Sequence, residues 1–206
     1  MLSKISFAIC GFVLSFIIFV TIRFVTFQQP QDTHFHANFE IYINGNKIDL
    51  SKDKYMEPVF SCSVNEQKDK QPSERVHMHL NNGGLIHIHD QHVTWGDFFS
   101  NIGYSVSQSN IVDDSNNIYK ADGDNKLVYI LNGVKSDSIA TLYINSEDKL
   151  LIYYGKQSDS EIINTIYAQV PNDAQVANLG HDPSSCTGNT SKKIDFWEQL
   201  KKSVIN

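Results

Sequence analysis

The sequence predicts a mixed α+β domain preceded by one transmembrane helix. Three observations lead to this fold class: an uncharged run of eighteen residues near the N-terminus, apolar and polar residues alternating with period two beyond residue 33, and one short helical pattern at 94–103. A chain of 206 residues favours one main domain. With a net charge of −6 and 17 Lys and Arg residues, the chain has no basic stripe, so nucleic acid is not an expected partner.

The uncharged run is ISFAICGFVLSFIIFVTI, Ile5–Ile22, which as a helix can cross about 30 Å of hydrocarbon. Arg23 follows it and can reach the far interface with its long side chain. Lys4 precedes it, which predicts a cytoplasmic N-terminus and an extracytoplasmic remainder. A cleaved signal peptide is the alternative, but the run is long and no Ala-x-Ala-like site follows it. We therefore expect a transmembrane anchor at 1–27 and a linker at 28–33.

The stretch HFHANFEIYING predicts a half-buried strand that ends in a hairpin turn. Its odd-numbered positions are apolar and its even-numbered positions polar, so His34 and His36 lie on the face away from the core. Asn44-Gly45 is a strong signal for a two-residue hairpin turn. Residues 51–74 are polar and irregular. The residues expected to pack there are Tyr55, Val59 and Phe60.

The stretch RVHMHLNNGGLIHIHDQH, at 75–92, predicts a second pair of strands around Asn-Asn-Gly-Gly. A one-residue slip in register would move one of its histidine pairs into the core. Pairing even-numbered with even-numbered residues avoids this and requires an odd loop length, such as a three-residue loop with a glycine in the left-handed region. The residues then predicted to face the core are Val76, Met78, Leu80, Ile86 and Ile88. His77, His79, His87 and His89 share the opposite face, with cross-strand neighbours about 5 Å apart at Cβ.

The stretch VTWGDFFSNIG predicts a short helix on the core side of these strands. Thr94 is a good N-cap with Asp97 three residues later, and Gly103 ends the helix. KLVYILNG and KLLIYYG predict two further strands. SEIINTIYAQV and SKKIDFWEQLKKSVI are helix-like. For the apolar stripe of the second, Ile194, Trp197, Leu200 and Val204, we expect core packing, with partner binding as the alternative.

This order of strand, strand, helix, strand and strand over residues 75–155 resembles the β-grasp arrangement of ubiquitin-like and sulfur-carrier proteins. The resemblance implies a β-grasp-like mixed sheet with one short helix, to which the strand at 34 adds an N-terminal hairpin. The domain then covers 34–157, with a helical C-terminal extension at 158–206. Sulfur carriers and protein modifiers act through a free Gly-Gly carboxyl terminus, whereas Gly155 is followed by residues 156–206. A conjugated modifier is therefore excluded.

A second resemblance covers residues 1 to about 155. The order is His-x-His-Ala before a strand that ends in Asn-Gly, then His-x-His, Gly-x-Ile-His-x-His and a Trp-Gly-x-Phe-Phe helix. This order is similar to that of a set of uncharacterised single-pass membrane proteins of archaea and little-studied bacteria. It supports the architecture and implies no mechanism.

The histidines carry the chemistry that the sequence predicts. His-x-His on a strand points two imidazoles to one side, within reach of one metal ion. The alternative for any one pair is a solvated polar strand face, but seven of the eight histidines lie between 34 and 92. The candidate metal ligands are His34, His36, His77, His79, His87 and His89, with His92 as a weaker addition. Asp90 is a candidate for hydrogen bonding to a ligand.

Imidazole ligands suit Zn(II), Cu(II) and Ni(II), and we expect copper or zinc. The predicted function is an anchored extracytoplasmic protein that buffers, senses or delivers this metal. One alternative is a metal-dependent enzyme on the same ligands with Glu40 as its base, although the sequence has neither His-Glu-x-x-His nor a cupin-like His-x-His followed by Glu and a further His. Another is a β-grasp interaction module whose histidines are incidental or sense pH. Cys62 could pair with Cys186 in an oxidising compartment or act as a further metal ligand.

Overall fold

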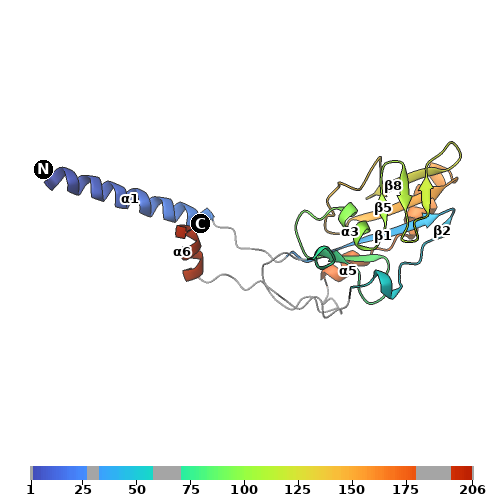
Figure 1. Ribbon diagram of the computed structural model, residues 1–206, viewed down its shortest axis with the longest axis horizontal. Helices are drawn as coiled ribbons and strands as arrows, with labels where there is room; N and C mark the ends of the chain where they lie inside the picture. The colour runs from blue at the N-terminus through green and yellow to red at the C-terminus, as the bar shows by residue number, and fades with distance from the viewer. Residues whose placement is uncertain (1, 27–32, 58–70, 180–195, 206) are drawn as a thin grey trace. The chain divides into compact units, whose positions relative to one another are not determined.

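The computed structural model describes residues 2–26, 33–57, 71–179 and 196–205. These residues belong to two compact units (Figure 1). The first holds helices α1, Leu2–Thr26, and α6, Phe196–Ile205. Within α1, Ile9–Thr26 is long and apolar enough to cross a membrane, a test that a signal sequence also passes. The predicted N-terminal apolar helix is therefore confirmed.

The second unit is built around a mixed seven-stranded sheet with the order β3-β4-β1-β10-β8-β9, in which β2 also pairs with β1. The strands are β1 Phe35–Ile43, β2 Asn46–Lys47, β3 Val76–His77, β4 Leu85–Ile88, β8 Lys126–Leu131, β9 Val134–Ser136 and β10 Lys149–Gly155. The two central strands, β1 and β10, are parallel, and the other pairs are antiparallel. The predicted mixed α+β class is confirmed. The strand at 34 lies at the centre of the sheet, so it is not an added hairpin at its edge.

Two Asn-Gly pairs form the tight turns of this sheet. Asn44 and Gly45, between β1 and β2, have φ of 52° and 80°, as the predicted two-residue turn requires. Asn132 and Gly133, with φ of 53° and 79°, join β8 to β9 in the same way. Strand β9 was not predicted. A second sheet of three short strands was also not predicted; it comprises β5 Ser105–Val106, β6 Asn110–Val112 and β7 Ile118–Lys120.

The predicted register of the histidine-rich strands is confirmed, but their loop differs. Val76 pairs with Ile88 and His77 with His87, so even-numbered residues meet even-numbered ones. Leu80 was expected in the core and is 59% exposed. It forms a tight turn with Asn81, in which both residues have positive φ and the Asn82 N–H donates to the His79 carbonyl at 3.0 Å. The residues with left-handed backbone conformation are therefore Leu80 and Asn81, which precede Gly83 and Gly84.

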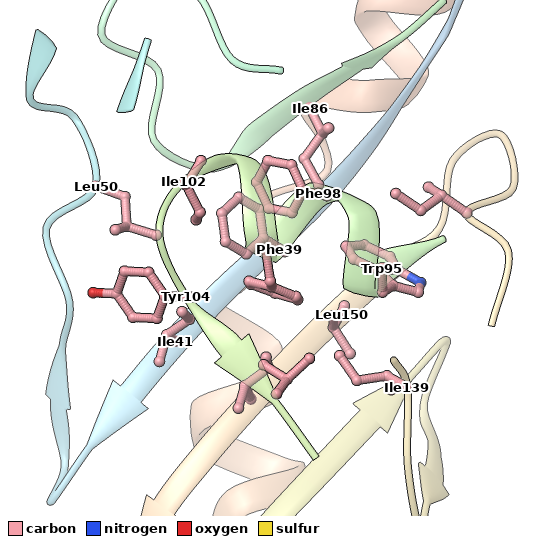
Figure 2. Close-up of a cluster of buried hydrophobic side chains, with 14 of the residues drawn as sticks. Phe39, Ile41, Leu50, Ile86, Trp95, Phe98, Ile102, Tyr104, Ile139 and Leu150 are labelled. Atoms are coloured by element: carbon pink, nitrogen blue, oxygen red, sulfur yellow. The ribbon is translucent and has the colours of Figure 1, made fainter. Parts of the chain in front are cut away.

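The main core lies between the sheet and α3, Trp95–Asn101 (Figure 2). Thr94 caps this helix as predicted: the Asp97 N–H donates to Thr94 Oγ1 at 3.1 Å, and the Thr94 N–H donates back to the Asp97 carboxylate at 2.8 Å. Phe98 lies edge-on to Phe39 of β1, with 4.8 Å between ring centroids. Among the described residues that precede α3, η1 Asp53–Tyr55 and α2 Pro72–Arg75 are short helices.

The opposite face of the sheet is also covered, by the segment after β10. Its elements are α4 Asp159–Glu161, the π-turn η3 Ile162–Ile166, the 3₁₀-turn η4 Tyr167–Gln169 and α5 Asp173–Leu179. Ile162 and Ile166 pack with Val128 and Leu151 in a second apolar cluster. This segment therefore buries the face of the sheet that the sequence placed away from the core. Helices α3 and α5 lie on opposite sides of β1 (Figure 1).

Candidate metal centre

Three neighbouring strands bring the predicted histidines onto one face. Strand β4 lies between β1 and β3, and His87 of β4 pairs with His36 on one side and with His77 on the other. Residues directly opposite one another in antiparallel strands point to the same side of the sheet. Two residues beyond the His36–His87 pair, the same register brings His34 beside His89, and their rings stack with 4.5 Å between centroids.

The six imidazoles form one continuous cluster. The ring of His87 lies 4.6 Å from that of His36 and 5.0 Å from that of His79, and His77 and His79 are 4.3 Å apart. Three of these histidines, His34, His87 and His89, offer ligand atoms that all lie within 4.8 Å of one another. The structure therefore brings together all six members of the three His-x-His pairs.

The cluster is largely buried. His36, His77, His79 and His87 are each at most 5% exposed, and His34 and His89 are half-buried. Helix α5 packs against β1 and β4 on this face, where the Ala174 N–H donates to Asn38 Oδ1 at 2.8 Å. The interpretation of these four histidines as a solvated strand face is therefore wrong.

Backbone carbonyls orient two of the rings. His77 Nδ1 is hydrogen-bonded to the Ser73 carbonyl, and His79 Nδ1 to the Glu57 carbonyl at 2.5 Å. A carbonyl oxygen only accepts, so each Nδ1 must carry the proton. In the neutral ring, Nε2 then holds the lone pair that a metal ion needs.

Asn178 of α5 orients a third and a fourth ring. Its Oδ1 lies 2.8 Å from His36 Nδ1 and accepts the His36 backbone N–H at 3.0 Å, while its Nδ2 donates to Ser146 Oγ. His36 Nδ1 is therefore the donor. His36 Nε2, 3.2 Å from His87 Nδ1, must then accept, which leaves the lone pair of His87 on Nε2. No sequence pattern around Asn178 indicated this role.

The other candidates lie apart from the cluster or are engaged elsewhere. His92 is exposed, has φ of 58° and contacts the Tyr143 ring at 5.3 Å. Asp90 forms an ion pair with Arg75 Nε at 2.8 Å. Glu40 is buried beside Lys47, with which it forms an ion pair.

The surroundings of Glu40 affect one titratable neighbour. Burial, followed by the negative charge of Glu40, raises the pKa of Tyr42 to about 12, so this phenol stays protonated at neutral pH. The ion pair with Lys47 occupies one of the two carboxylate oxygens of Glu40. Cys62, Cys186, Val59 and Phe60 lie outside the described residues.

Comparison with protein-family models, curated proteins and solved structures finds no match for this chain.

Proposed function

We propose that this chain is a membrane-anchored, extracytoplasmic protein that binds a divalent transition metal, copper or zinc, in order to buffer, sense or deliver it. The observation that carries the proposal is the convergence of His34, His87 and His89, whose ligand atoms lie within 4.8 Å of one another inside a cluster of six imidazoles. Neutral imidazole is the commonest protein ligand for both metals.

The residues offer such an ion three imidazole ligands, the number that zinc sites with an open coordination position use. Ligands of a tetrahedral zinc lie about 3.3 Å apart, given Zn–N bonds of about 2.0–2.1 Å. The separations of up to 4.8 Å between the ligand atoms of His34, His87 and His89 must therefore shorten when an ion binds. The fixed Nδ1 protons of His77 and His79 resemble the outer hydrogen bonds that orient histidines at known metal sites.

The strand order supports a β-grasp-like interpretation of the fold. In that arrangement two parallel strands lie at the centre, a single antiparallel strand flanks one of them, an antiparallel pair of strands flanks the other, and a helix covers one face. Here β1 and β10 occupy the centre, β8 and β9 form one hairpin, and α3 covers one face. The other edge of β1 departs from the β-grasp arrangement, because β1 pairs there with two strands, β2 and β4, instead of one.

Anchoring is proposed from α1 and from the position of Lys4. With α1 as its anchor, the metal-binding domain works close to a membrane surface. The enzyme alternative has less support, because Glu40, its candidate base, is paired with Lys47.

Calorimetric titration of Zn(II) and Cu(II) into the metal-free full-length protein, purified in detergent without a histidine tag, tests the proposal. We expect His87→Asn to weaken binding at least about 100-fold, since it removes the central ligand. His89→Asn, at a half-buried position that tolerates polar substitution better, should weaken it similarly. His92→Asn is the matched control and should leave the affinity unchanged.

Equal effects of the three substitutions would overturn the proposal. So would an affinity no greater than that of a short His-x-His peptide. Binding should also weaken as pH falls from about 7.5 to 5.5, because protons compete for imidazoles with a reference pKa of about 6.5.

A further inference from the structure

Helix α6 carries an apolar stripe that remains exposed within the compact unit formed by α1 and α6. Trp197 is 73% exposed, Phe196 57% and Val204 47%, and Leu200 is half-buried. At about 100° per residue, these four side chains fall within an arc of about 100° on one side of the helix. Of the stripe predicted to pack in a core, Ile194 lies outside the described residues, and Trp197 and Val204 are exposed within the unit that α6 forms with α1.

Helix α6 contacts the end of α1 through one edge. The Phe196 ring lies 5.3 Å from the Phe24 ring, and Gln199 Nε2 donates to the Phe24 carbonyl at 2.9 Å. The last carbonyls of a helix have no partner within it, so Gln199 satisfies one of them. This contact holds α6 at the last turns of α1 while Trp197 and Val204 stay uncovered.

The position of this contact corresponds to a definite depth in a bilayer. No residue of the candidate span Ile9–Thr26 is buried in the structure, and Phe24 lies near its end, where a spanning helix leaves the hydrocarbon. Trp side chains are enriched at that level, helices that lie in it carry Trp, Phe and Leu on their apolar face, and lysines can extend from it into water.

The local charge also suits a lipid surface. The stretch 191–206 contains Lys192, Lys193, Lys201 and Lys202 against Asp195 and Glu198, a net charge of +2 in a chain of net charge −6. Basic residues beside an apolar stripe favour binding of a helix to anionic headgroups.

We propose that α6 lies in the headgroup region of the membrane that α1 spans, with Trp197 and Val204 directed into the lipid. This inference rests on the anchoring part of the proposed function and is independent of metal binding. The domain is then joined to the bilayer through both of its chain ends.

The two tryptophans make a direct test, because Trp95 is fully buried in the core whereas Trp197 is 73% exposed. The full chain is reconstituted in vesicles of phosphatidylcholine and phosphatidylglycerol whose acyl chains carry bromine, a contact quencher. We expect the emission of Trp197 to be strongly quenched, more by bromines near the headgroup than by bromines near the bilayer centre. Trp197→Phe removes the quenched component and leaves the emission of Trp95 unaffected. Leu200→Asp should reduce quenching by lifting the stripe from the lipid.

Flotation of the vesicles separates the possible failures. Protein that does not float with the vesicles would overturn both the anchoring and this inference. Protein that floats, with Trp197 emission equal in brominated and ordinary lipid, would overturn the inference alone. Protection of Trp197 from aqueous iodide without bromine quenching would assign the stripe to a protein contact instead and also overturn it.

Discussion

Each buried imidazole carries its proton on the ring nitrogen that faces a hydrogen-bond acceptor. Most of these acceptors belong to residues outside the His-x-His pairs. Ser73 and Glu57 accept with backbone carbonyls, which every residue has. Asn178 does it with a side chain, and its effect passes through His36 to His87. A substitution at Asn178 therefore changes the orientation of two rings without removing an imidazole.

Replacing Asn178 tests this relay. Asn178→Leu removes the acceptor for His36 Nδ1, so we expect metal affinity to fall about 10- to 100-fold, as for other groups that orient metal ligands. Asn178→Asp keeps an oxygen at the same position and should retain most of the affinity. Calorimetry on both variants, with the fold checked by near-UV circular dichroism, distinguishes orientation from general damage. Equal losses in the two variants would contradict the relay.

The elements divide into those with a strong local signal and those without one. Strict alternation fixed the register of β3 and β4, and the Thr94 capping box located α3, because in both cases the chemistry lies within a few neighbouring residues. The strands β5 to β7 are only two or three residues long, which is too short for any periodicity to be recognised. Leu80 was wrongly predicted to face the core, because it forms a turn with Asn81 in which both residues are left-handed and neither is glycine.

Helix α3 also depends on a close backbone approach that the sequence did not reveal. The Gly96 N–H donates to the Ala140 carbonyl at 3.0 Å, and a Cβ on Gly96 would lie 2.5 Å from that oxygen. Any side chain there must push the loop away and stretch this hydrogen bond.

We therefore expect Gly96→Ala to destabilise the domain by about 1 to 3 kcal/mol, the usual cost of overpacking. Alanine's higher helix propensity, at most about 1 kcal/mol, offsets part of this. Gly123→Ala is the matched control, because no atom lies within 4 Å of its built Cβ, and its effect should stay within about 0.5 kcal/mol. Urea unfolding of both variants measures the difference. If Gly96→Ala left the free energy of unfolding unchanged, the loop at Ala140 would have to move away from the new side chain at no cost, which would contradict the prediction.

At the scale of the whole domain, the histidine cluster lies between the sheet and a segment that follows it in the chain. The sequence allowed the shared face of the histidines to be predicted, since that follows from alternation alone. It did not allow their burial to be predicted, because the covering helix α5 is more than 80 residues from His87 in the chain and only tertiary packing brings them together. The candidate site is consequently part of the folded core and should not persist in the unfolded chain.

Metal binding should therefore stabilise the domain against heat. A ligand that binds only the folded state contributes about 2.7 kcal/mol at a free concentration 100 times its Kd. For a chain of this size that corresponds to a rise in Tm of roughly 5–10 °C. Near-UV circular dichroism, which reports the packing of Trp95 and its aromatic neighbours, follows the transition at pH 7.5 with and without Zn(II), and a chelator should reverse the rise. The rise should shrink as the pH is lowered through about 6.5, where protonated imidazole loses its lone pair, and should be absent in His87→Asn. A metal that binds without changing Tm would have to bind the unfolded chain equally well, which a site assembled from β1, β3 and β4 cannot do.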